Sequence, residues 1–180
     1  MVDTPRTLSA LQTLLANNSA GDIGAQDLRD MLVSLQNDHG EIYVSSSAET
    51  AIATKDTWVE ATDGTYTLAA NNNNFSHGTN GRLQYDGNET RVFHISASWA
   101  MISAGSNKTY EIGIGVDGTV STASIMRMKH ATGADVQTGH CHRFISLATG
   151  SYVSMMIRNI TDTTNATLEL ANLFAMGMLL

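Results

Sequence analysis

The stretch that decides the fold runs from Arg82 to Met101 and reads Arg-Leu-Gln-Tyr-Asp-Gly-Asn-Glu-Thr-Arg-Val-Phe-His-Ile-Ser-Ala-Ser-Trp-Ala-Met. Two extended runs flank Asp86-Gly87-Asn88, and an Asp-Gly pair at such a point is typical of a tight β-hairpin turn. Because successive side chains of a strand point to opposite faces, one set is predicted to enter a core: Phe93, Ile95, Ala97, Trp99 and Met101. His94, Ser96 and Ser98 then face solvent or a neighbouring subunit.

The same alternation recurs along the rest of the chain. Tyr110, Ile112, Ile114 and Val116 alternate with small or polar residues and end at a turn, Asp117-Gly118. Further strands are predicted at residues 121–130 and 136–147. In the last strand, residues 167–178, one face is predicted to carry Leu168, Leu170, Asn172, Phe174 and Met176. Eight to ten strands without intervening helices predict an antiparallel jelly-roll sandwich over residues 39–180.

The first 38 residues follow a helical pattern instead. Leu8, Leu11, Leu14 and Leu15 recur at helical spacing. A second helix is predicted over residues 21–35, where one stripe at i, i+3, i+4 and i+7 comprises Leu28, Met31, Leu32 and Leu35. Short helices cannot leave such stripes in water, so we interpret residues 1–38 as an anchor. The stripe packs either on its own β domain or on a partner, and the pattern leaves both open.

Composition excludes several classes of function. The 180-residue chain has a net charge of −7 and only 10 Lys and Arg, scattered along it, so no nucleic-acid partner is expected. Neither a secretory signal pattern nor an apolar run long enough for membrane insertion is evident. The single cysteine, Cys141, allows no disulfide within the chain and fits assembly in a reducing cytoplasm.

The most specific candidate for a metal-binding or catalytic site is His140-Cys141-His142. Strand alternation puts His140 and His142 on one face, where they would share a metal ion if a third ligand such as His130 joined them. Histidines at a subunit contact or in solvent are the commoner case, so we predict no metal and no cofactor. The sequence contains no Gly-x-Ser-x-Gly nucleophile elbow and no phosphate-binding loop. A glycosidase needs two carboxylates at a defined separation, and the sequence cannot show whether two of the glutamates come together. The chain is predicted not to be an enzyme, and a polysaccharide depolymerase stays a third, least favoured alternative.

Two surfaces are predicted to bind partners. Residues 71–81 form a long loop without helical or strand period, and loops of this kind are often functional. Its candidate ligand-binding residues are Asn72, Asn74, Phe75 and His77. Late strands carry large apolar residues on both faces, which favours a subunit interface comprising Met126, Met128, Tyr152, Met156 and Phe174.

Three segments carry a resemblance to a known class. The order Tyr85-Asp86-Gly87-Asn88, Gly115-Val116-Asp117-Gly118 and residues 145–153 resembles trimeric jelly-roll domains of bacteriophage structural proteins. Those domains are similar to the globular head of complement and to the tumour-necrosis-factor fold. Residues 21–35 resemble the leader of phage fibre and small virion proteins. The resemblance implies a homotrimer without a catalytic site, located in the virion.

Two functions fit these expectations. The first is a trimeric capsid decoration, or cement, protein held by its helices on the major capsid protein. The alternative is the receptor-binding head of a tail fibre or tail tip, which contacts tail proteins and recognises a host-surface glycan. The absence of a repetitive shaft favours decoration, and the fibre-like leader favours the tail.

Overall fold

The computed structural model describes residue 6 and residues 8–16, 23–34 and 37–178. The chain forms two compact units, one of residues 1–37 with 178–180 and one of Asp38–Gly177.

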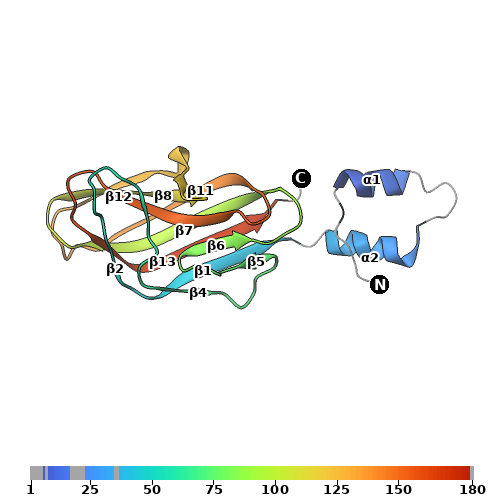
Figure 1. Ribbon diagram of the computed structural model, residues 1–180, viewed down its shortest axis with the longest axis horizontal. Coiled ribbons are helices and arrows are strands. Elements are labelled where there is room, and N and C mark those ends of the chain that lie inside the picture. The colour runs from blue at the N-terminus through green and yellow to red at the C-terminus, as the bar shows by residue number, and fades with distance from the viewer. Residues whose placement is uncertain (1–5, 7, 17–22, 35–36, 179–180) are drawn as a thin grey trace. The chain divides into compact units, whose positions relative to one another are not determined.

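The smaller unit contains two helices, α1 (Leu8–Ala16) and α2 (Ala25–Ser34), shown in Figure 1. Oδ2 of Asp27 accepts a hydrogen bond of 2.9 Å from the backbone N–H of Gly24 and so satisfies a free donor at the start of α2. Arg6 donates to Asp27 and to Asp30 over 3.0 Å in each case. Within the described residues, no helix is long and apolar enough to span a membrane.

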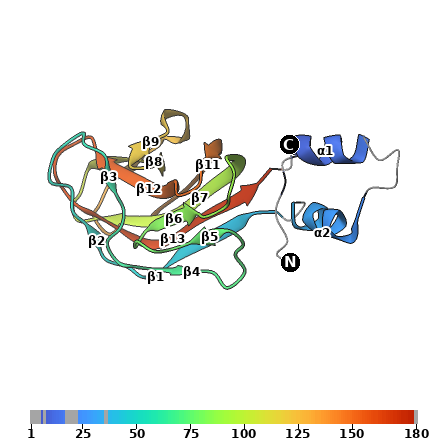
Figure 2. The same cartoon turned by 45° about the vertical axis from the view of Figure 1, so that its right-hand side comes forward.

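The larger unit is a sandwich of two sheets in which every strand pair is antiparallel, as predicted (Figure 2). The first sheet has the order β11-β7-β13-β1-β4, with β2 paired to β13. Its strands are β1 (His39–Ser46), β2 (Glu49–Thr50), β4 (Thr65–Leu68), β7 (Arg91–Ser103), β11 (Gln137–Leu147) and β13 (Ala166–Gly177).

The second sheet has the order β10-β8-β12-β6-β5, with β3 paired to β12 and β9 to β8. Its strands are β3 (Val59–Glu60), β5 (Phe75–Ser76), β6 (Arg82–Tyr85), β8 (Lys108–Val116), β9 (Thr119–Val120), β10 (Met126–His130) and β12 (Tyr152–Asn159). The residues predicted as strand 121–130 include a 3₁₀ turn, η1 (Thr122–Ser124), before β10 begins.

The core lies between the two sheets. The inward side chains predicted for the second half of the opening stretch are all buried there, namely Phe93, Ile95, Ala97, Trp99 and Met101. From the opposite sheet, β12 contributes Val153, Met155 and Ile157. The alternation of β7 is therefore confirmed.

The predicted hairpin at Asp86-Gly87 is wrong. β6 pairs with β5 and β12, whereas β7 pairs with β11 and β13, so the segment between them crosses from one sheet to the other. Gly87 is needed for space, because a Cβ there would lie 2.1 Å from Oη of Tyr85. The Asp117-Gly118 turn is a true hairpin between β8 and β9, and both of its residues have positive φ.

A β-bulge changes the face of β13 partway along the strand. The register shifts between Leu168 and Leu170, so Leu168 points into the core and is 4% exposed, while Leu170 is 66% exposed. The prediction that both share one face is wrong because the extra residue reverses the alternation. Leu170, Asn172, Phe174 and Met176 remain together on the outer face, as the later half of the pattern predicts.

Candidate functional site

The outer face of the first sheet brings four strands into cross-strand rows. The register places residues of β11, β7, β13 and β1 side by side in three rows: His140, Ser98, Asn172 and Tyr43; His142, Ser96, Phe174 and Glu41; Phe144, His94, Met176 and His39. We call these residues, together with Leu170, the His-rich face. It holds four of the six histidines of the chain.

The His-rich face exposes several large apolar side chains and carries almost no charge. Its large exposed side chains are Tyr43 at 41%, Phe144 at 60%, Leu170 at 66% and Met176 at 43%. Glu41 is its single Asp, Glu, Lys or Arg, and the Glu41 carboxylate accepts a hydrogen bond from Asn172. Depletion of charge together with exposed aromatic and Met side chains is typical of the buried centre of a protein–protein interface.

The His-rich face is also hollowed. A groove of about 620 Å³ crosses the same four strands and is bordered by Tyr43, Ser98, His140, Leu170 and Asn172. An apolar side chain from another molecule would find contact on several sides there. The face therefore offers both protruding groups and a recess, as an interface requires for shape complementarity.

Two histidines of this face form a direct pair. Nε2 of His94 lies 3.3 Å from Nδ1 of His142, with the ring planes 75° apart. Phe144 contacts the His94 ring at a centroid distance of 5.3 Å. The sequence-based pair was His140 and His142, and both lie on the outer face as predicted. However, the close partner of His142 is His94 on β7, because strand pairing brings the two together diagonally.

Cys141, which strand alternation turns away from the two histidines, and His130, the hypothetical third ligand, lie elsewhere. Cys141 points into the core, where burial raises the pKa of its thiol to about 11. His130 is fully buried at the end of β10, against the ring of Tyr110. Among the described residues, no group of three or more His, Cys, Asp or Glu side chains could hold a metal ion within one chain.

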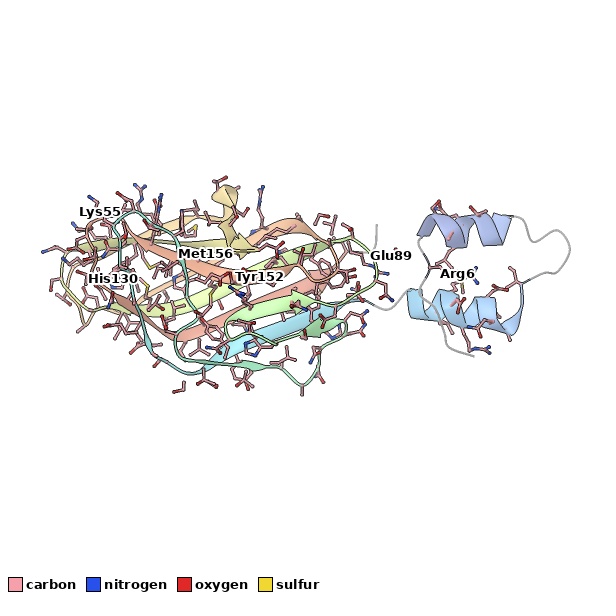
Figure 3. All side chains as sticks on the ribbon, in the orientation of Figure 1. Arg6, Lys55, Glu89, His130, Tyr152 and Met156 are labelled. Carbon is pink, nitrogen blue, oxygen red and sulfur yellow. The ribbon has the colours of Figure 1, made fainter. Side chains whose placement is uncertain are left out.

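Most of the predicted subunit interface lies on the other sheet. Figure 3 labels Tyr152 and Met156 on β12, and Met156 is only 3% exposed. β3 pairs with β12 opposite Met156, and Met156 also fills the space left by Gly115. Burial of both faces of β12 is therefore achieved within one chain, which removes Met156 from the predicted interface.

The remaining members of that set do not form one surface. The Arg82 guanidinium covers the Tyr152 ring at 4.3 Å and also binds Glu60. Met128 packs against the core, and Met126 is 45% exposed on β10. Phe174 lies on the His-rich face.

The predicted ligand loop is held by internal bonds. Nδ2 of Asn72 donates to the backbone O of Ala69, and Nδ2 of Asn74 donates to Oδ1 of Asp38. Phe75 is 4% exposed and packs on Tyr85 and Phe93. Nε2 of His77 accepts from the backbone N–H of Gly81, and burial lowers the pKa of His77. These four residues shape the loop, so they present little free hydrogen-bonding capacity to a glycan.

The predicted anchor residues are partly exposed within the helical unit. Leu28 is 48% and Leu32 is 63% exposed, and Met31 is half-buried. Leu35 lies outside the described residues. Among the described residues of the helical unit, Leu28 and Leu32 thus expose an apolar stripe along α2.

Sequence reasoning missed Tyr43, His94, Phe144, Leu170 and Met176 as one surface. Their outward phase could be read from the alternation of each strand. Their proximity could not, because it depends on which strands pair and in which register.

The fold is similar to the tumour-necrosis-factor-type jelly roll. The alignment with the structure of Eiger TNF from S. frugiperda covers 79% of this chain and 93% of the Eiger chain, at 8% identity and a TM-score of 0.51. Murine APRIL at pH 5.0 matches 76% of this chain and 98% of its own, at 8% identity and a TM-score of 0.50. At such identities the likeness shows the fold alone.

A third match is the PRD1 vertex protein P5. The alignment covers 79% of this chain and 73% of the P5 chain, at 10% identity. Its TM-score of 0.45 is too low to support an argument. No protein-family model matches the sequence, and no curated protein does.

Proposed function

We propose that the protein is a non-enzymatic structural protein that forms a homotrimer through the His-rich face and decorates a bacteriophage capsid. The observation that carries self-association is the exposure of Tyr43, Phe144, Leu170 and Met176 on a face with a single charged residue. Apolar patches of this kind mark interaction sites on soluble proteins.

The chemistry of the face supports a second copy as its partner. A face without clusters of Lys, Arg, Asp or Glu has nothing to neutralise phosphates or basic peptides. The same surface carries the protruding side chains of Leu170 and Phe144 and the groove beside Tyr43. An apolar side chain of one copy can therefore enter the groove of another. The resemblance to trimeric jelly-roll domains supports three copies in the assembly.

The helical unit supports attachment to a particle. Leu28 and Leu32 on α2 expose an apolar stripe, and α2 is too short to be stable in isolation. We propose that this stripe binds the major capsid protein. A receptor-binding head is disfavoured, because Asn72, Asn74 and Phe75 of the predicted ligand loop are engaged within the protein.

Light scattering tests the assembly. The wild-type protein is expected at three times 19.3 kDa at micromolar concentration. Leu170→Glu should give the mass of one chain, since it places a charge on the His-rich face. Met126→Glu is the matched control, because Met126 is a similarly exposed apolar residue of the other sheet. A wild-type monomer, or dissociation by Met126→Glu alone, would refute assembly through this face.

The number of copies per particle tests the location. Quantitative mass spectrometry of purified particles should find hundreds of chains for a capsid decoration protein. A few tens or fewer would move the assignment to the tail.

A further inference from the structure

We propose that His94 and His142 form a bidentate site for a divalent transition-metal ion, with Zn²⁺ as the reference ion. The inference goes beyond the proposed function and requires only one chain. It starts from the 3.3 Å separation of Nε2 of His94 and Nδ1 of His142.

The separation fits chelation of one ion. Zn–N bonds of about 2.0–2.1 Å at a tetrahedral angle place two ligand nitrogens about 3.3–3.4 Å apart. As a hydrogen bond, 3.3 Å is long, since N–H donors usually lie about 2.9–3.0 Å from their acceptors. Two neutral imidazoles can each direct a lone pair at a common point, so a metal ion would enter with little rearrangement.

The surroundings suit a cation and hold the ligands in place. Phe144 contacts the His94 ring at 5.3 Å, and both histidines stand on long paired strands, β7 and β11. The His-rich face carries no Lys or Arg that would repel an ion. With two protein ligands, the other coordination positions of the ion stay open for water or for a ligand from another copy. A site with two protein ligands agrees with the absence of a three-ligand group among the described residues.

Metal binding is measured by calorimetric titration of Zn²⁺ into full-length protein after removal of metals with EDTA. One ion per chain is expected. His94→Gln and His142→Gln should each weaken binding by about 10²-fold or more, because loss of one ligand abolishes the chelate gain. His140→Gln is the control, since His140 is exposed on the same face and stays outside the pair. Binding of Co²⁺ should give a visible absorption band that disappears in the same two variants.

Self-association on this face could cover the histidines, so the titration is repeated in Leu170→Glu, which keeps them accessible. Absence of binding in both backgrounds overturns the site, as does binding that survives the double substitution of His94 and His142. The mass of the wild-type protein in EDTA reports on assembly separately. A monomer both in EDTA and after addition of Zn²⁺ refutes the proposed trimer, while the titration still decides the metal site.

Discussion

Nη1 of Arg91 lies 3.2 Å from Oδ2 of Asp38, the first residue of the β unit. The Asp38 carboxylate is almost fully buried and also accepts hydrogen bonds from Oη of Tyr85 at 3.0 Å and Nδ2 of Asn74 at 2.7 Å. The backbone O of Asp38 accepts from the N–H of Gly177, at the end of the last strand. Asp38 therefore joins the beginning of the β unit to its end and to both sheets.

Substitution Asp38→Asn is expected to lower the free energy of unfolding by about 2–4 kcal/mol, since it leaves the partly buried Arg91 without its counter-charge. Urea unfolding at pH 7 measures the change. Asp86→Asn is the matched control, because Asp86 is exposed and should tolerate the amide. Equal stabilities of the two variants would show that the Asp38 charge contributes nothing.

Removal of the helical unit should leave a folded β unit, provided that Asp38 is kept. A protein lacking residues 1–37 is expected to melt within a few degrees of the full chain and to lose attachment to particles. Removal of residues 1–38 also deletes Asp38 and should lower the melting temperature by roughly 5–15 °C. Scanning calorimetry compares the two. Identical melting would contradict the role of Asp38, and particle binding by the shorter proteins would refute the anchor.

Trp99→Ala is expected to destabilise the protein by about 3–5 kcal/mol, because it removes a large side chain that is 4% exposed between the sheets. Chemical unfolding followed by circular dichroism gives the value. Ser98→Ala, at the adjacent and exposed position, should change stability by less than about 0.5 kcal/mol. A Trp99→Ala protein as stable as the wild type would mean that β7 has the opposite phase.

Acid should weaken the fold through His130. Burial lowers the pKa of His130 below its ordinary value of 6.5, and Nε2 has no hydrogen-bond partner among the described residues. The unfolded chain then binds a proton that the folded chain does not. Stability is complete above about pH 6.5 and falls as the pH decreases, by at most about 1.4 kcal/mol per pH unit.

Urea unfolding between pH 5 and 8 tests this, with His130→Phe expected to flatten the profile. His77 acts in the same direction because burial also lowers its pKa. Ser98→Ala, which removes no titratable group, is the control and should leave the slope unchanged. The pKa of Glu111 is lowered too, since hydrogen bonds from Arg127 and Arg158 outweigh its burial. The stability that this lowered pKa provides is lost only in more acidic solutions, as the pH falls below 4.5, the ordinary pKa of a glutamate. If His130→Phe shows the same dependence of stability on pH as the wild type, His130 is not the cause of the acid destabilisation.

Local alternation was sufficient to predict much of the β unit. The inward set on β7, the turn at Asp117-Gly118 and the inward direction of Cys141 follow from a period of two and from turn chemistry. Gly113 is one of the small residues that alternate with Ile112 and Ile114, and it packs closely, since a Cβ there would meet the side chains of Val120 and Ser124 at 3.0 and 3.1 Å. These features depend on neighbours in the sequence, which is why they could be predicted.

Tertiary structure alone decided the rest, because strand pairing joins residues that are distant in the sequence. The Asp86-Gly87 turn signal could not reveal that β6 and β7 belong to different sheets. Burial of Met156 depends on β3, almost a hundred residues earlier in the chain, so its two-faced pattern resembled a subunit interface. The His94–His142 pair depends on the register of β11 against β7, which a shift of one residue would destroy.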